Sequence, residues 1–244
     1  MICDVIVVGG GVLGATVAYL SAREGLRTLL LDRLDEGRAT DAGAGIILPR
    51  INTRSEALFE LGLRSAAYYP TLLGHLGEDG GGDTGYAVCG DLRVAVTEDE
   101  LVPYRAMIEL LGERRAGHGA PTVDEIREVS PDEARGAFPP LARPLRALHD
   151  RTAARVDGRL LNQALLRAAA RRRLDVLKLD ADRLVIEGDR VVGVAAGPEV
   201  HQAGHVVIAG GAWSPAFAAD LRAAVPVAPQ RGQIIHLALA DQRT

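Results

Sequence analysis

Apolar residues near the N terminus are grouped so that a strand, a helix and a second strand are predicted in succession. Residues 2–8 (ICDVIVV) form a short apolar run typical of a buried parallel strand. Across residues 12–24 apolar side chains recur at helical spacing, and Gly25 is placed to end that helix. Residues 28–31 (TLLL) predict a second strand, which ends at Asp32. The pattern therefore predicts a β-α-β unit.

The middle of the chain alternates between helical and strand patterns. Residues 54–77 predict a long amphipathic helix, and the glycine-rich stretch 77–85 (GEDGGGDTG) is interpreted as a surface connector. Residues 87–97 (AVCGDLRVAVT) predict a pair of strands bent at Gly90-Asp91. Residues 98–112 predict a further helix.

Cap and turn residues delimit the elements of the second half. A capping box in Ser130-Pro131-Asp132-Glu133 predicts a short helix that ends before the proline-rich segment 138–144, which we interpret as an internal boundary. Residues 158–173 predict a helix that leads into a buried strand at 174–179. A hairpin centred on Gly188-Asp189 and a fully apolar strand then follow.

The composition excludes several classes of function. The chain has 244 residues, 48% of them hydrophobic, so it can bury a substantial core. Its formal net charge of −4 offers no basic surface for nucleic acid or anionic lipid. Cys3 and Cys89 are too few for a disulfide framework and lack ligand spacing, so no metal site is expected. No signal peptide or membrane span is predicted, and we expect a cytoplasmic protein.

Three glycines between the first strand and the helix carry the main chemical signal. Gly9, Gly11 and Gly14 form GxGxxG, in which the first permits a tight turn, the second a close backbone approach, and the third close helix packing. The helix N terminus would then face a diphosphate with free N–H groups. Asp32 lies 18 residues beyond Gly14, where an acid can accept hydrogen bonds from a ribose hydroxyl. This combination predicts dinucleotide binding.

Both nicotinamide and flavin dinucleotides use this fingerprint, and the next segment favours the flavin. Residues 37–50 (GRATDAGAGIILPR) form a loop rich in small residues, where a nicotinamide-dependent dehydrogenase would normally continue with another βα unit. Small side chains let backbone approach a flat, bulky ligand, so we interpret the loop as a flavin contact. A plain surface loop remains the alternative.

The sequence resembles the FAD-dependent amino acid oxidase superfamily, which includes D-amino-acid oxidase, glycine oxidase and sarcosine oxidase. The resemblance rests on the glycine turn extended by Ala18 and Gly25, on the loop 38–46, on the helix pattern 156–172 and on HVVIAGGAWS at 205–214. Members of the superfamily usually have glutamate where this chain has Asp32. The resemblance implies FAD contacts at Gly9, Gly11, Val12, Leu13, Gly14, Asp32, Arg33, Ala39, Thr40, Ala44, Gly45, Ile46, Ala209, Gly210 and Trp213.

The same resemblance implies an α/β fold: a Rossmann-like FAD-binding domain with an interleaved, mostly β substrate domain that is incomplete in this chain. The FAD-binding domain would comprise residues 1–85 and 148–222. The substrate domain would comprise residues 86–147 and return at 223–244, where PVAPQRGQIIHL resembles the strand leading into it.

The implied activity is oxidation of the C–N bond of a small amino acid or secondary amine. A hydride passes to flavin N5 and the imine left behind hydrolyses. The superfamily's substrate-anchoring region lies beyond Thr244, so a second chain or a missing C-terminal segment would complete the fold. Arg50 and Arg231 are candidates for the carboxylate anchor, with a solvated or ion-paired arginine as the alternative for each. Two other functions stay open: a non-catalytic flavin-binding fragment or partner subunit, and an NAD-dependent dehydrogenase.

Overall fold

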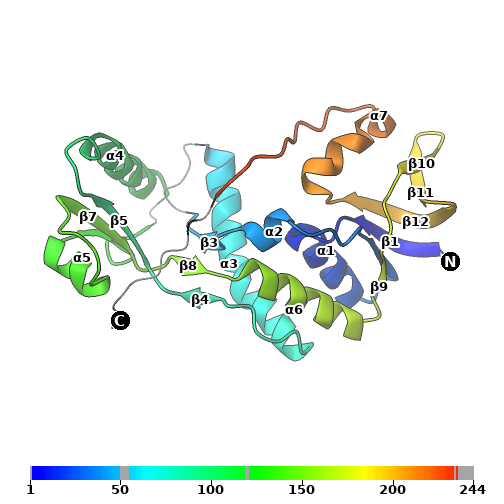
Figure 1. The fold of residues 1–244 in the computed structure, drawn as a ribbon, viewed down its shortest axis with the longest axis horizontal. Helices are drawn as coiled ribbons and strands as arrows, with labels where there is room; N and C mark the ends of the chain where they lie inside the picture. Colours follow the sequence, from blue (N-terminus) through cyan, green and yellow to red (C-terminus); the bar gives the residue numbers. More distant parts are fainter. Residues whose placement is uncertain (1, 50–54, 119–120, 234, 236–244) are drawn as a thin grey trace. The chain divides into compact units, whose positions relative to one another are not determined.

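The predicted β-α-β unit is present as β1 (Ile2–Val8), α1 (Val12–Arg23) and β2 (Thr28–Leu31) in the computed structural model (Figure 1), which describes residues 2–49, 55–118, 121–233 and 235. The two strands run parallel, with Val5 opposite Thr28 and Val8 opposite Leu31. Most of their side chains are buried because both strands are apolar and lie inside a larger sheet.

That sheet has six strands in the order β10-β11-β12-β1-β2-β9. β10 (Arg183–Glu187) and β11 (Arg190–Ala196) form the predicted hairpin, turning at Gly188 with a φ of +64°. β12 (Glu199–Ile208) pairs antiparallel with β11 and parallel with β1. β9 (Asp175–Leu177) was predicted to be buried, but two of its three residues are exposed, because it is the edge strand and has a neighbour on one side only.

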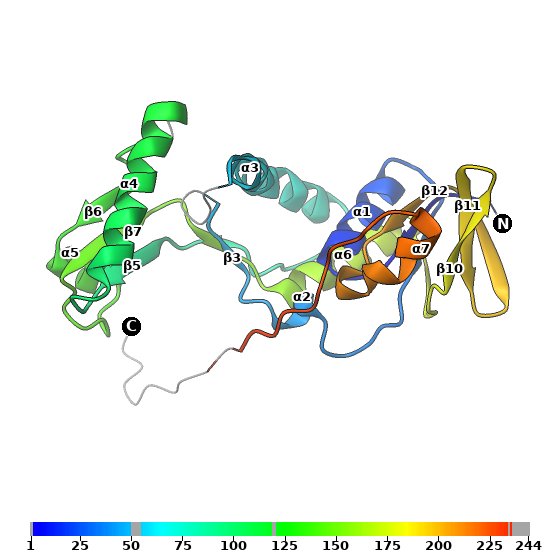
Figure 2. The same cartoon turned by 90° about the horizontal axis from the view of Figure 1, so that it is seen from above.

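Two helices with small buried side chains pack together beside this sheet. α1 buries Ala15, Ala18 and Ala22, and α6 (Gly158–Arg171) buries Ala164 and Ala168. Such short side chains allow two helix backbones to approach closely, and α1 and α6 lie side by side in both views (Figure 2). The core on one face of the sheet consists of Ile6, Val8, Leu29, Leu31, Leu184, Val194, Ala196, Ala203 and Phe217.

The glycine-rich segment that follows α3 (Glu56–Glu78) is only partly the surface connector that we predicted, because Gly82 and Asp83 are exposed whereas other residues of the segment are packed. Asp79 and Thr84 are each only 6% exposed, and Gly81 is buried. The Gly81 carbonyl accepts a hydrogen bond from Arg167 Nε of α6 at 2.8 Å. Polar composition misled the prediction because these polar groups are satisfied by partners distant in the sequence.

A second set of elements is built from two three-stranded sheets. One has the order β3-β8-β4, from Ile46–Ile47, Ala154–Arg155 and Ala87–Val88. The other has the order β5-β7-β6, from Asp91–Ala95, Arg146–Asp150 and Ile126–Val129. The helix predicted at 98–112 is α4 (Leu101–His118), which starts three residues later and ends six residues later. It packs on the second sheet through a core of Ala95, Tyr104, Leu111, Ile126 and Leu148.

The two strands predicted around Gly90 exist, but they are not a pair. β4 pairs with β8, whereas β5 pairs with β7 in the other sheet. Gly90 has a φ of +75° and turns the chain between the sheets, while the N–H groups of Cys89 and Gly90 donate to the Ala153 carbonyl. Each strand therefore finds its partner at long range.

The capping box predicted at Ser130 begins α5 (Pro131–Ala137). Ser130 Oγ accepts from the Glu133 N–H at 3.1 Å, and the Glu133 carboxylate accepts from the Ser130 N–H at 2.9 Å. Hydrogen bonds from Arg127 and Ser130 lower the pKa of the Glu133 carboxyl to about 2. The helix ends before Pro139, as predicted.

Replacing Ser130 with alanine should lower the free energy of unfolding by about 1 kcal/mol, because the Glu133 N–H loses the hydroxyl that caps it. Urea unfolding followed by circular dichroism measures the change. Ser65→Ala on an exposed position of α3 is the matched control and should stay within about 0.5 kcal/mol of the parent. Equal losses in the two variants would contradict the capping role.

Contacts divide the chain into two compact units. Unit 1 comprises residues 1–44, 72–85 and 157–234, and unit 2 comprises 45–71, 86–156 and 235–244. The change after residue 85 coincides with a predicted boundary, whereas residues 45–71 and 148–156, which were predicted to lie in the FAD-binding domain, group with unit 2. In that unit β7 pairs with β5 and β6, and β8 pairs with β3 and β4. Residues 226–233, predicted to begin a returning strand, are irregular. The assignment of a flavin domain and a substrate domain stays a prediction.

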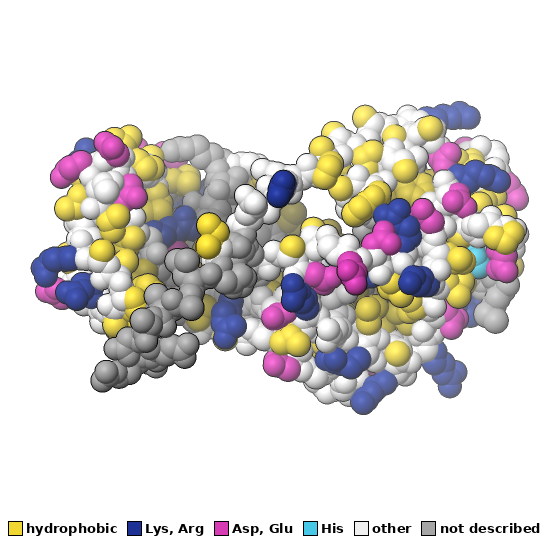
Figure 3. All heavy atoms as spheres, viewed as in Figure 1, with side chains coloured by type: hydrophobic (Ala, Val, Ile, Leu, Met, Phe, Trp, Pro, Cys, Tyr) yellow, Lys and Arg dark blue, Asp and Glu magenta, His cyan; other side chains and the backbone are white. Residues whose placement is uncertain are grey.

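The surface shown in Figure 3 carries acidic and basic side chains intermixed. Among the helices in the described part of the chain, none combines the length and apolarity that crossing a membrane requires.

Candidate functional site

The glycine turn between β1 and α1 has the conformation that its spacing predicts. Gly9 has a φ of +102°, and a Cβ there would lie 2.5 Å from the Ala209 carbonyl oxygen. A Cβ on Gly14 would lie 1.8 Å from the Gly9 carbonyl oxygen. Both positions therefore require glycine, the first for its backbone angle and the second for the close approach of α1 to the turn.

The N terminus of α1 is left without a side-chain cap of its own. Gly11 is the N-cap residue, and the Val12 N–H donates to Thr40 Oγ1 at 2.9 Å. Thr40 lies on α2 (Ala39–Ala42) within the predicted loop. The first N–H groups of a helix have no acceptor within the helix, so this end favours an anion. Val12 and Thr40 are thus brought together, and Leu13 is 75% exposed beside them.

Asp32 lies directly beside the turn, as predicted. Its carboxylate accepts hydrogen bonds from the Gly10 N–H, from the Leu34 N–H at 2.6 Å and from Arg38 Nη2 at 2.8 Å. The side chain is only 13% exposed. An ionised carboxylate offers about four acceptor positions, so one position remains for a hydroxyl group of a ligand.

The two peptide groups on either side of Gly10 are both held by side chains. The Gly10 N–H donates to Asp32, and the Gly10 carbonyl accepts from Arg38 Nη1 and from Asn162 Nδ2, each at 3.2 Å. Sequence reasoning missed Asn162 as a site residue. The available signal was a polar side chain on the otherwise apolar face of α6, beside Leu161 and Leu165.

The end of β12 meets the turn from the other side. The Ala209 N–H donates to the Val8 carbonyl at 2.7 Å, and the Ala209 carbonyl oxygen faces Gly9. Gly210 precedes η1 (Gly211–Phe217), a short 3₁₀-helix that carries Trp213. The Arg33 guanidinium lies 5.2 Å from the centroid of the Trp213 ring, and Trp213 is 60% exposed. Arg33, Ala209, Gly210 and Trp213 thus belong to unit 1 with the turn.

The remaining predicted site residues are not all part of this cluster. Ala39 and Ala44 are exposed residues of unit 1. Gly45 and Ile46 belong to unit 2, where Gly45 accepts from the Val156 N–H at 2.9 Å and Ile46 opens β3. Arg231 is exposed on an irregular segment, and Arg50 lies outside the described residues.

The residues of unit 1 fit a dinucleotide diphosphate. A Cβ on Gly11 would have Thr40 Oγ1 as its single neighbour within 4 Å, so the space beside the helix N terminus is open. Asn162, which also contacts the turn, is 6% exposed, and its Oδ1 has no hydrogen-bond partner among the described residues. As an acceptor, this oxygen pairs with a hydroxyl or N–H group of a ligand and not with a phosphate oxygen. A helix N terminus that presents N–H groups beside the Thr40 hydroxyl, and close backbone packing at Gly9 and Gly14, are the features that a diphosphate requires.

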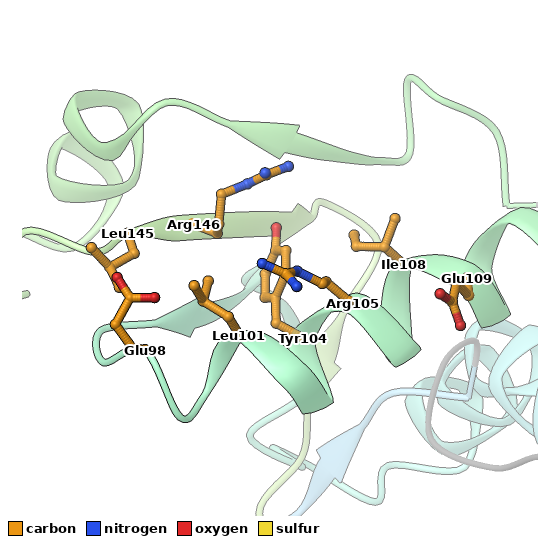
Figure 4. A pocket seen from close by; sticks show the side chains of 8 residues that line it. All are labelled: Glu98, Leu101, Tyr104, Arg105, Ile108, Glu109, Leu145 and Arg146. Atoms are coloured by element: carbon orange, nitrogen blue, oxygen red, sulfur yellow. The ribbon is translucent and has the colours of Figure 1, made fainter.

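A separate pocket of about 410 Å³ lies in unit 2 between α4 and the start of β7 (Figure 4). Leu101, Ile108 and Leu145 form its apolar part, and its polar part consists of Glu98, Tyr104, Arg105, Glu109 and Arg146. Tyr104 Oη donates to the Glu128 carboxylate at 2.9 Å, and Arg146 pairs with the same carboxylate. None of the predicted site residues lines this pocket. Within the described residues, no three acidic, His or Cys side chains are grouped as metal ligands.

Comparison with known proteins gives relatives along the whole chain. Residues 4–243 match the profile of a family described as FAD dependent oxidoreductase (DAO). The uncharacterized oxidoreductase YurR of Bacillus subtilis is 35% identical over 240 residues, which cover 98% of this chain and 63% of YurR. A glycine oxidase of Pseudomonas aeruginosa is 33% identical over 238 residues, covering 95% of this chain and 61% of that protein.

A solved structure shares the fold. The crystal structure of iminodiacetate oxidase from Chelativorans sp. BNC1 matches with a TM-score of 0.78 and 30% identity, over 88% of this chain and 57% of that one. The chain therefore spans less than two thirds of the length of the relatives that it matches.

Proposed function

Since the chain belongs to the family of FAD dependent oxidoreductases, we propose that it binds FAD in unit 1 and takes part in oxidising the C–N bond of a small amine that carries a carboxymethyl group. The observation that carries the proposal is the glycine turn with its open helix N terminus, bounded by Asp32, Thr40 and Ala209. The family description favours FAD over a nicotinamide cofactor.

The substrate class follows from the names of two relatives. Glycine and iminodiacetate, named in those proteins, share a nitrogen bonded to a CH₂ group that bears a carboxylate. We extend this class to the present protein, within the small amino acids and secondary amines predicted from the sequence. The carboxylate would need a cationic anchor, for which Arg50 and Arg231 remain proposals.

The residues of unit 1 have separable tasks in this proposal. The N–H groups at the start of α1 and the Thr40 hydroxyl hold the diphosphate, while Asp32 accepts from a sugar hydroxyl through its remaining acceptor position. Ala209, Gly210, Arg33 and Trp213 bound the site at the end of β12. Bound FAD supplies the hydride acceptor, and the substrate nitrogen loses a proton to water, so that an imine is left to hydrolyse.

Binding and reduction of the cofactor test this function on the purified chain. FAD at about 100 times its Kd should stabilise the native state by about 2.7 kcal/mol, and NAD at the same concentration should not. Anaerobic glycine or iminodiacetate should bleach the flavin absorbance near its visible maximum. Alanine amide, which lacks a carboxylate, is the control amine and should leave the spectrum unchanged.

The possible outcomes separate the alternatives. Protection by NAD in place of FAD would favour the nicotinamide dehydrogenase. FAD binding without bleaching by any amine would favour a flavin-binding fragment or partner subunit that a second chain or a further segment must complete. No binding of either dinucleotide would contradict the proposal.

A further inference from the structure

We propose that Asn162 of α6 is a positioning residue for the diphosphate of the cofactor: it holds the Gly10–Gly11 peptide so that the Gly11 N–H faces the ligand. The proposal rests on the proposed FAD function and adds a residue from a helix remote in sequence from the glycine turn. Asn162 would act through the backbone, without touching the reacting atoms.

The contacts identify which atom of the peptide is held. Asn162 Nδ2 donates to the Gly10 carbonyl at 3.2 Å, across a separation of 152 residues. A carbonyl oxygen only accepts hydrogen bonds, so the amide nitrogen of Asn162 must be the group that faces it. Arg38 Nη1 donates to the same oxygen at 3.2 Å, and Asp32 accepts from the Gly10 N–H.

Because the peptide group is planar, the hydrogen bond from Asn162 to the Gly10 carbonyl also fixes the direction of the Gly11 N–H. In a trans peptide the C=O of one residue and the N–H of the following residue point in opposite directions. Fixing the Gly10 carbonyl toward Asn162 and Arg38 therefore directs the Gly11 N–H away from them. Gly9, Gly10 and Gly11 are consecutive glycines, whose backbone is otherwise free to rotate, so the orientation needs a partner outside the turn.

The surroundings of Asn162 indicate that its polarity serves the turn rather than the packing of α6. The neighbouring buried residues on this helix are Leu161, Ala164 and Leu165. Asn162 is 6% exposed, and its Oδ1 is buried without a hydrogen-bond partner among the residues that the structure describes. An apolar side chain of similar size would avoid the unfavourable free energy of that unpaired acceptor. The Asn162 amide instead supplies the N–H group that donates a hydrogen bond to the Gly10 carbonyl.

Asn162→Leu separates positioning from folding, because it keeps the branched shape and the number of heavy atoms and removes both the donor and the unpaired acceptor. FAD titration by fluorescence quenching should give a Kd about tenfold higher than that of the parent, the loss expected for one buried hydrogen bond. The melting temperature without FAD should stay equal or rise. Gln163→Leu, at the exposed neighbouring position, is the matched control and should change neither quantity.

Asn162→Asp adds a signature that a purely structural role would not produce. An ionised carboxylate repels the Gly10 carbonyl, whereas the protonated acid can donate to it. The FAD affinity of this variant, relative to the parent at each pH, should therefore improve as the pH falls from about 8 to about 5.

The outcomes distinguish a failure of the positioning role of Asn162 from a failure of the proposed FAD function. If the parent protein binds FAD and Asn162→Leu binds it equally well, the positioning role is wrong while the proposed function stands. If the affinity loss is matched by a loss of stability without FAD, and Asn162→Asp shows no pH dependence, Asn162 is structural and the inference fails. If the parent binds no FAD, the proposed function and this inference fall together.

Discussion

Gly14→Ala should weaken FAD binding and destabilise unit 1, because the new methyl group would lie 1.8 Å from the Gly9 carbonyl oxygen. That oxygen belongs to the backbone of the binding turn and cannot move aside without displacing Gly9, whose φ of +102° already depends on glycine. Moving α1 outward would instead separate its N terminus from the turn. We expect the free energy of unfolding to fall by about 3 kcal/mol and the Kd for FAD to rise at least about tenfold.

Gly74→Ala is the matched control for this substitution. Gly74 also lies inside a helix, α3, but a Cβ there has no neighbour within 4 Å. Alanine is the better helix former by about 0.5–1 kcal/mol, so this variant should be as stable as the parent or more stable. Urea unfolding and FAD titration of both variants measure the contrast. Equal behaviour of the two alanine variants would contradict the requirement for glycine at position 14.

Asp79→Asn should lower the free energy of unfolding by about 3 kcal/mol, because it neutralises a buried carboxylate whose ion pairs tie the glycine-rich segment to α1 and to the end of α6. Asp79 accepts from Tyr19 Oη of α1 at 2.8 Å, from Arg23 Nη1 of α1 at 2.6 Å and from Arg172 Nε at 3.0 Å. Its side chain is 4% exposed, so water cannot replace these partners. Burial and the contact with Asp79 raise the pKa of Tyr19 to about 12.

The stabilisation by Asp79 should depend on pH in a defined direction. Hydrogen bonds from Arg172 and Arg23, with a further one from Tyr19, hold the pKa of the Asp79 carboxyl well below its usual range. A lowered native pKa gives stability that is complete above the unfolded value of about 3.9 and is lost as the pH falls toward the native value. The difference between the parent and Asp79→Asn should therefore be constant from about pH 6 to 8 and shrink below about pH 4.

Glu78→Gln is the control for this second substitution. Glu78 is the preceding residue and also pairs with Arg23, but its side chain is 64% exposed. An exposed ion pair contributes at most about 1 kcal/mol, so its removal should have a small effect. Denaturant unfolding of both variants between about pH 3 and 8 measures the two losses. Similar small losses, or a difference that does not change below about pH 4, would contradict the role assigned to the buried carboxylate.

Local chemistry made several features predictable from the sequence. The capping box at Ser130 and the hairpin at Gly188 follow from residues within a few positions of each other, and each element of the β-α-β unit follows from the residue pattern within that element. The family resemblance, the α/β class and FAD as the family cofactor were also predicted, and the family match and the shared fold of iminodiacetate oxidase confirm them. The residue-by-residue FAD contacts stay predictions.

Long-range packing accounts for what the sequence patterns missed. Asn162 meets Gly10 from 152 positions away, and Asp79 meets Arg172 from 93 positions away. Apolar periodicity shows which face of a helix is buried, but it does not show which backbone carbonyl that face will meet. β4 and β5 were likewise predicted as strands from their residue pattern. Their pairing with β8 and β7, in two different sheets, could not be predicted from that pattern. Short-range order thus follows from backbone angles and side-chain periodicity, whereas the partners of buried polar groups depend on how distant elements pack.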